Sequence, residues 1–169
     1  LLCYSEKLLN LTLTSKVNNI IIKFGDLDSI KYLHTKIDII NSYYLNYAAL
    51  NGNLASMKWL KENGCRFDED TFSAAAENGN LDNMKWLKEN ECQFNVWTFN
   101  YAAMNGNLEN MKWLKENGCE LSDYTFNFAA SHGNLYNMKW LKENGCQCPF
   151  SHYTFSMDAI YENQNNINS

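Results

Sequence analysis

Apolar residues recur along this chain at helical spacing, and the whole pattern repeats every 27 residues. In the stretch 54–62, Leu54, Met57 and Leu60 fall on one side of a helix with about 100° per residue. The nine-residue segment 57–65 recurs at 84–92, 111–119 and 138–146, so each step is 27 residues (84−57, 111−84, 138−111). A fixed period of this size predicts one supersecondary unit stacked on copies of itself.

Each regular unit divides at a glycine into two predicted helices. The first helix carries a pair of alanines, where we expect another helix to come close. The dividing glycine suits a helix end with positive φ, and the asparagine after it suits the N-cap of the second helix. These pairs are Gly52-Asn53, Gly79-Asn80, Gly106-Asn107 and Gly133-Asn134.

A second glycine ends the second helix in three of the four regular units, at Gly64, Gly118 and Gly145. In the remaining unit, Glu91 occupies this position. A non-glycine residue in a left-handed conformation costs roughly 1 kcal/mol. The substitution Glu91→Gly is therefore predicted to stabilise the fold.

Trp59 and its three copies point roughly 140° away from Leu54 and its copies on the predicted second helices. A helix packed on one partner only has no use for an apolar ring there. The tryptophans therefore favour a helix held between its own partner and the neighbouring repeats, as in a solenoid.

The repeats predict one elongated domain with modified ends. The first unit keeps the glycine and apolar positions but changes its surface, as an end cap does. The expected organisation is a remnant or cap at 1–16, a repeat array at 17–156 and a cap or polar tail at 157–169. Within the array, 17–43 is the divergent first unit, regular units run to 147, and a final half unit starts at 148.

The composition limits the classes of partner. The net charge is −5, with 46% hydrophobic and 20% charged residues, as in an ordinary folded protein. This mild acidity argues against nucleic acid or an anionic membrane as the main partner. No apolar run approaches the roughly 18 residues of a membrane span, and no signal segment is recognisable. We expect a cytoplasmic protein.

The cysteines and histidines give little support for catalysis or metal binding. One cysteine recurs in each regular unit, and equivalent residues about 8–10 Å apart are too distant for disulfides. His34, His132 and His152 fall in different units. Cys146, Cys148 and His152 offer ligands that suit zinc, but a fourth ligand is lacking. We expect no enzyme activity, cofactor, metal or small-molecule substrate.

The repeat resembles the ankyrin family, whose unit reads T-P-L-H-x-A-A-x-x-G and then G-H-L-E-V-V-K-L-L-L-E-x-G-A. Residues 102–114 follow A-A-x-x-G-H-L-E-V-V-K-L-L closely, and Glu116 and Gly118-Cys119 match the closing motif. The resemblance covers 17–156 and implies an all-α solenoid of helix-turn-helix repeats. Because the unit is about six residues shorter than the family's 33, it also implies shortened or absent β-hairpin fingers.

Asn- and Lys-rich short repeats of this kind are similar to the ankyrin-type arrays of giant DNA viruses and amoebae. A viral origin implies that the protein works in the host cytoplasm.

In the ankyrin arrangement the first helices line a concave face. Two positions on that face differ between otherwise similar units: the residue before the Thr-Phe pair, and the residue two before the dividing glycine. Tyrosine and tryptophan are preferred anchors at protein interfaces, and methionine adapts to its partner. The predicted partner-binding residues are Asp70, Glu77, Trp97, Met104, Tyr124, Ser131 and Tyr153.

The sequence therefore favours a non-enzymatic scaffold for protein–protein interaction, alone or as the recognition part of a larger protein. One alternative is a structural or virion-associated repeat protein. The other, a zinc-binding or enzymatic protein, is disfavoured. A nucleic-acid stacking surface made by the tryptophans is disfavoured too, since that position is apolar in the resembled family.

Overall fold

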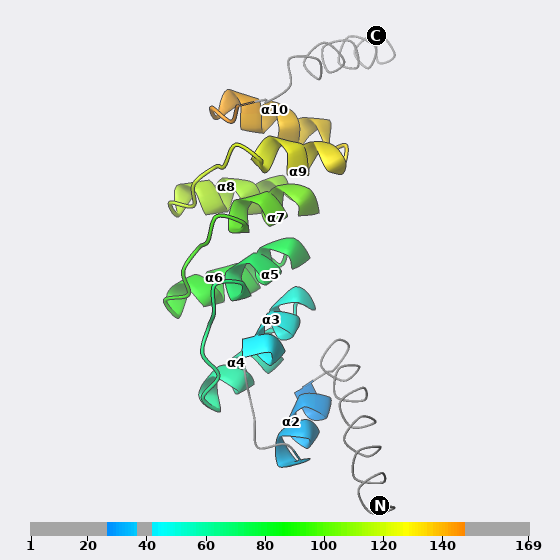
Figure 1. Ribbon diagram of the computed structural model, residues 1–169, viewed down its shortest axis with the longest axis vertical. Coiled ribbons are helices and arrows are strands. Elements are labelled where there is room, and N and C mark those ends of the chain that lie inside the picture. The colour runs from blue at the N-terminus through cyan, green and yellow to red at the C-terminus, as the bar shows by residue number, and fades with distance from the viewer. Residues whose placement is uncertain (1–26, 37–41, 148–169) are drawn as a thin grey trace, which may run out of the picture. The chain divides into compact units, whose positions relative to one another are not determined.

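The computed structural model describes residues 27–36 and 42–147, and all regular structure in these two ranges is α-helical (Figure 1). No strand occurs within them, as expected if the β-hairpin fingers are shortened or absent. The helices are α2 (Leu27–Lys36), α3 (Ser42–Leu50), α4 (Leu54–Glu62), α5 (Thr71–Asn78), α6 (Leu81–Glu89), α7 (Thr98–Asn105), α8 (Leu108–Glu116), α9 (Thr125–Ser131) and α10 (Leu135–Glu143).

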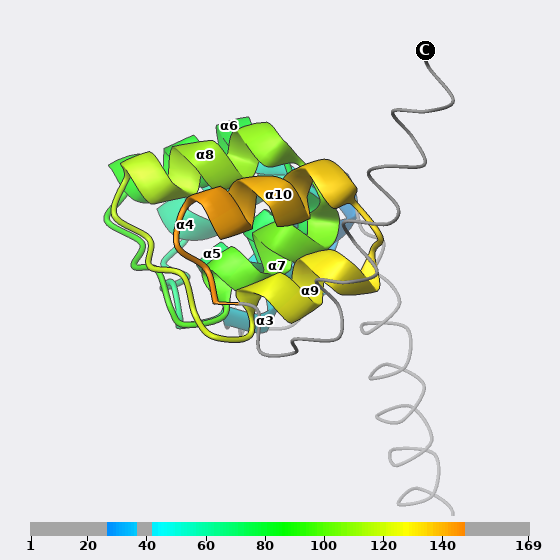
Figure 2. The same cartoon turned by 90° about the horizontal axis from the view of Figure 1, so that it is seen from above.

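The chain divides into two compact units between Gln93 and Phe94. In the N-terminal unit, α3 packs against α4 and α5, α5 packs against α6, and α2 packs against α4. In the C-terminal unit, α7 packs against α8 and α9, and α9 packs against α10. The first helices α7 and α9 lie in one layer of this unit and the second helices α8 and α10 in the other (Figure 2).

The predicted asparagine caps are confirmed in all four regular units. The side chain of Asn80 accepts hydrogen bonds from the backbone N–H groups of Asp82 and Asn83, at the start of α6. Asn134 accepts one from Asn137 at the start of α10. Asn53 and Asn107 cap α4 and α8 in the same way. Each cap satisfies backbone donors that the helix itself leaves unpaired, which contributes about 1 kcal/mol.

The backbone conformation at the helix ends also follows the sequence pattern. Gly79 and Gly106 have φ angles of 82° and 87° and cap α5 and α7. Glu91 has φ 64° and is the one non-glycine residue with positive φ in the described ranges. The prediction that Glu91 occupies a left-handed position is confirmed, whereas its energetic consequence stays a prediction.

Each unit has a core built from the same repeat positions. In the N-terminal unit Phe72 lies between the helices with no exposed surface, and in the C-terminal unit Phe99 does the same. The methionine and the second leucine of each repeat are buried around them, and so are the alanines of the pair except Ala130, which is half-buried. Burying a side chain of this size stabilises the fold by about 1.5–3 kcal/mol, so the repeated apolar positions are the framework of the protein.

The four tryptophans of the second helices are half-buried and lie at the edge of this core. The Trp86 ring meets the Phe67 ring edge-on, with centroids 5.9 Å apart, and the Trp140 ring stacks on Phe99 at 6.4 Å. Packing against residues outside the tryptophan's own helix is thus confirmed for these two. Full burial is not observed, because the indole points away from the line of Met and Leu residues that faces the first helix.

One buried position is not anticipated by the apolar pattern. The third residue of each second helix is polar and buried: Ser56, Asn83, Asn110 and Asn137. The amide atoms of Asn83 and Asn137 form no hydrogen bond with protein groups in the described ranges. Burial of an amide without a partner costs free energy, and we have no physical account of its repetition here.

Candidate functional site

The residue before each Thr-Phe pair is held outward by a turn. In the C-terminal unit the side chain of Asn95 accepts a hydrogen bond from the Trp97 amide at 2.9 Å, and the Asn95 amide donates to Thr98 Oγ1 at 3.1 Å. Thr98 is buried, so its neighbour Trp97 points the other way and is 45% exposed. The hydrogen bonds of the turn therefore hold the Trp97 side chain in solvent, although an indole ring is more stable when buried.

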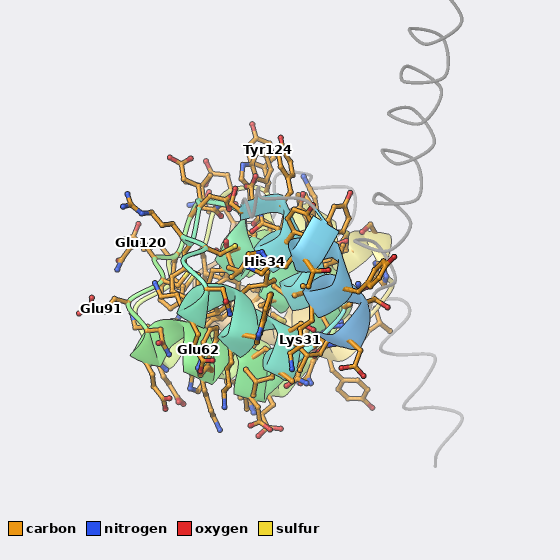
Figure 3. All side chains as sticks on the ribbon, turned by 90° about the horizontal axis from the view of Figure 1, so that it is seen from below. Lys31, His34, Glu62, Glu91, Glu120 and Tyr124 are labelled. Carbon is orange, nitrogen blue, oxygen red and sulfur yellow. The ribbon has the colours of Figure 1, made fainter. Side chains whose placement is uncertain are left out.

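The same turn recurs before α9. The Ser122 amide donates to Thr125 Oγ1 at 3.0 Å, and the Tyr124 amide donates to Ser122 Oγ at 3.2 Å. Tyr124 is 63% exposed and projects away from the helices (Figure 3). The buried Thr125 hydroxyl also donates to Asn100 Oδ1 on α7 at 2.6 Å. This bond and the bond from Ser122 Oγ to the same oxygen, at 2.8 Å, tie the turn to the neighbouring first helix.

Aromatic rings gather on α7 and α9 of the C-terminal unit. The Trp97 and Phe128 ring centroids are 6.3 Å apart at an interplanar angle of 62°. The Tyr101 and Phe128 centroids are 5.9 Å apart at 71°. Tyr124 stands one helical turn before Phe128, since the Phe128 amide donates to its carbonyl oxygen. We call Trp97, Tyr101, Tyr124 and Phe128 the aromatic surface.

Two of these four residues are in the predicted site, and two are new. Tyr101 and Phe128 are half-buried and lie four residues after Trp97 and Tyr124, on the same side of their helices. The repeats do carry a signal for this position, because it reads Tyr47, Ala74, Tyr101 and Phe128 along the chain. A position that varies among near-identical units is not fixed by packing alone.

The remaining predicted residues are more dispersed. Met104 lies further along α7 and is half-buried, whereas Ser131, at the end of α9, is exposed and its hydroxyl donates to the Phe128 carbonyl oxygen at 2.8 Å. Asp70 and Glu77 belong to α5 and its N-cap in the N-terminal unit, where Asp70 is exposed and Glu77 half-buried. Tyr153 lies outside the described residues.

In the N-terminal unit the turn before α5 is built around a carboxylate. Asn46 of α3 donates to Asp68 Oδ1 and Oδ2 at 2.9 and 3.0 Å, and the Thr71 hydroxyl donates to Asn46 Oδ1 at 2.6 Å. Partial burial acts to raise the pKa of Asp68. Hydrogen bonds from Ser42, Asn46, Thr71 and the Asp70 amide outweigh it and hold that pKa below its ordinary value.

Charge is distributed unevenly between the two helix layers of the C-terminal unit. Every lysine in residues 94–147 lies on a second helix, and those lysines are exposed. The segments 94–107 and 120–134, which contain the first helices, have no Lys or Arg and two acidic residues, Glu120 and Asp123. Their net charge is therefore −2, with histidine neutral. Both carboxylates are exposed, and Asp123 is the chain neighbour of Tyr124.

The repeated cysteines lie in the interior of the fold. Cys65, Cys92, Cys119 and Cys146 are buried and are not in disulfides, as predicted. Burial raises the pKa of the Cys65 thiol to about 11. Burial, with a smaller contribution from the Asp68 carboxylate, raises that of Cys92 to about 12. Both thiols are protonated at neutral pH and are therefore poor nucleophiles.

Residues 27–36 and 42–147 contain neither a metal-binding cluster nor a membrane-spanning helix. Within them, no three His, Cys, Asp or Glu side chains gather closely enough to hold a metal ion. Two of the three potential zinc ligands, Cys148 and His152, lie outside these ranges. None of the helices described here has both the length and the apolar character needed to cross a bilayer.

Comparison with known proteins does not assign the chain to a family. No family model matches the sequence, and no curated protein gives a significant match. The described residues define an all-α protein made of repeated helix pairs.

Proposed function

We propose that this protein is an ankyrin-type repeat solenoid that holds a partner protein against its first helices. The aromatic surface is the observation that carries the proposal. It combines exposed Trp97 and Tyr124 with half-buried rings beneath them, on helices that are tied together by buried hydrogen bonds.

Such a surface suits protein recognition for a physical reason. Trp and Tyr side chains bury a large area with few rotatable bonds, so they lose little conformational entropy on binding. The edge-on contact of Trp97 with Phe128 already restricts the indole before a partner arrives. Preorganisation of this kind lowers the free-energy cost of association. Central aromatic anchors contribute about 2 kcal/mol or more each at interfaces of this type.

The repeat framework supports the same function. Helix pairs with equivalent cores and caps allow the outward residues to vary without disturbing the fold, as in other repeat proteins. The partner then binds by shape complementarity over several repeats, with no covalent chemistry. We propose a cytoplasmic setting, which is the host cytoplasm if the protein is viral.

The test is affinity capture from cell lysate with the wild-type chain and with the double variant W97A/Y124A. We expect the variant to lose the captured partner, because loss of about 2 kcal/mol at even one of the two anchors weakens binding about 30-fold. Tyr136 on α10 is a matched control, since it is an aromatic residue of the same unit and is 74% exposed. The variant Y136A should retain the partner.

Circular dichroism and thermal melting of each variant keep the interpretation clear. If W97A/Y124A captures the same partner in the same amount while folded, the proposal is wrong. If it fails to fold, the two residues belong to the core and the surface has been misassigned. Recovery of the wild-type chain only with virus particles or large assemblies points instead to a structural protein.

A further inference from the structure

We infer that the aromatic surface of the C-terminal unit binds a basic, extended peptide segment of its partner, with Lys or Arg side chains placed against Trp97 and Tyr124. This inference rests on the proposed function and adds the chemistry of the partner.

The rings of the aromatic surface keep part of their area free. The Trp97 and Tyr101 rings each make an edge-type contact with Phe128, at 62° and 71°, so neither is stacked face to face on it. Trp97 keeps 45% and Tyr124 63% of its surface exposed. An aromatic face that is open to solvent attracts a cation, because the ring quadrupole is negative above the plane.

The segments that carry α7 and α9 have a negative net charge. The segments that carry α7 and α9 contain Glu120 and Asp123 and no Lys or Arg. Glu120 and Tyr124 both project from the body of the unit into solvent (Figure 3). On these two segments an approaching Lys or Arg side chain therefore meets carboxylates and no like charge, whereas an acidic segment is repelled. A purely apolar segment has no electrostatic attraction to the carboxylate of Asp123, the chain neighbour of Tyr124.

Lysine side chains already pair with aromatic rings elsewhere in each unit. In the C-terminal unit Lys115 Nζ lies 5.9 Å from the Trp140 ring centroid and donates to the Asn144 carbonyl oxygen at 3.0 Å. In the N-terminal unit Lys61 Nζ lies 4.2 Å from the Phe67 ring centroid. Rings beside second helices thus receive a cation from the chain itself. The segments that carry α7 and α9 contain no Lys or Arg to pair with Trp97 or Tyr124, so these rings are suited to a cation from the partner.

The spacing of the anchors indicates the form of the peptide. Trp97 and Tyr124 hold equivalent positions on packed helices, which puts them about 8–10 Å apart along the stack. In a polyproline II segment, residues i and i+3 share a face and are about 9 Å apart. A basic residue at every third position of an extended peptide would therefore reach both rings.

The test uses the full chain and three labelled, proline-rich peptides with Arg, Gln or Glu at every third position, titrated by fluorescence anisotropy. We expect the Arg peptide to bind and the Glu peptide not to bind. We also expect W97A to weaken the Arg peptide about tenfold, whereas Y136A leaves it unchanged. Raising the salt concentration should weaken binding, because exposed charges are screened.

A charge-matched pair of variants tests the role of the carboxylates. E120Q/D123N removes the two charges of the segment that leads into α9, and E109Q/E116Q removes two exposed charges from α8. We expect the first pair to weaken the Arg peptide about two- to fivefold and the second to have no effect. Equal effects of the two pairs would overturn the inference, since net charge alone would then explain binding.

Two further results overturn the inference and leave the proposed function standing. If the Gln peptide binds as tightly as the Arg peptide, the surface takes an apolar or proline-rich segment. If no peptide binds while W97A/Y124A still loses its cellular partner, the surface recognises a protein that is not basic. If that partner is retained, the proposed function itself fails.

Discussion

The first-helix layers of the two units share a framework and differ in what they expose. Both use a buried Thr hydroxyl that donates at 2.6 Å to an Asn side chain of the preceding first helix: Thr71 to Asn46, and Thr125 to Asn100. Outside that framework the residues diverge. The series of exposed and half-buried residues reads Tyr43, Tyr47, Asp70 and Ala74 in the N-terminal unit and Trp97, Tyr101, Tyr124 and Phe128 in the C-terminal unit.

This difference separates residues that build the protein from residues that are free to serve a partner. Within the described helices, the repeated Met and second Leu of each unit are buried. The residue before the Thr-Phe pair and the residue four places later, where the copies disagree, lie wholly or partly in solvent. The nine-residue segment that dominates the sequence therefore builds the second helices. We propose that the neighbouring first helices carry the function.

The largest expected effect is loss of the shared framework. Phe72 and Phe126 hold the same repeat position in the two units, and both are buried. We expect F72A and F126A each to destabilise the fold by about 3–5 kcal/mol, because each leaves a cavity in a packed core. Urea denaturation followed by circular dichroism measures this. The control Y124A should cost less than about 1 kcal/mol, and a similar cost for Y124A and F126A would contradict the division into core and surface.

A smaller effect concerns the helix end that distinguishes the N-terminal unit. Glu91 has φ 64°, and Gly118 holds the equivalent position in the C-terminal unit with φ 83°. We expect E91G to raise the free energy of unfolding by about 1 kcal/mol and G118E to lower it by about as much. Space is not the limit at Gly118, since nothing lies within 4 Å of an added Cβ. Thermal melts of both variants test this, and a loss of stability in E91G would refute the strain argument.

The smallest expected effect is a difference between the two units in how stability depends on pH. It arises from the hydrogen-bonded bridge that links neighbouring first helices in each unit. Because the folded-state pKa of Asp68 lies below its ordinary value of 3.8, Asp68 stabilises the fold above that pH. That contribution is lost as the pH falls through the folded pKa. Asp68 is partly exposed, so we expect less than about 1 kcal/mol.

The C-terminal unit supplies the control, because Ser122 holds the same position as Asp68. The variant D68S should lose the component of acid destabilisation that begins just below pH 4. Unfolding free energies measured between pH 6 and pH 2.5 would show it. An unchanged pH profile in D68S means that the bridge does not favour the ionised carboxylate.

Most of the local structure follows from the sequence. The period of 27 residues predicts the helix pairs, the asparagines predict the caps, and the Gly pattern predicts even the positive φ of Glu91. These features depend on residues close together in the chain, which is why one repeat is enough to predict them. The ankyrin assignment and the continuous array over 17–156 stay predictions.

The site is less accessible to that reasoning. Trp97 and Tyr124 are predicted as exposed anchors, and the structure places both in solvent. The contacts of Tyr101 and Phe128 depend on how α7 packs against α9, which one helix viewed alone does not reveal. For the same reason the half-burial of the tryptophans on the second helices depends on neighbours outside the repeat pattern.

The most direct measurement compares Tyr43 and Tyr124, which occupy the same repeat position in the two units and are 68% and 63% exposed. Affinity capture is carried out in parallel with Y43A and Y124A, each verified as folded. If the aromatic surface of the C-terminal unit holds the partner, Y124A loses most of it and Y43A retains it. Equal retention by both variants, or loss only in Y43A, would contradict the account.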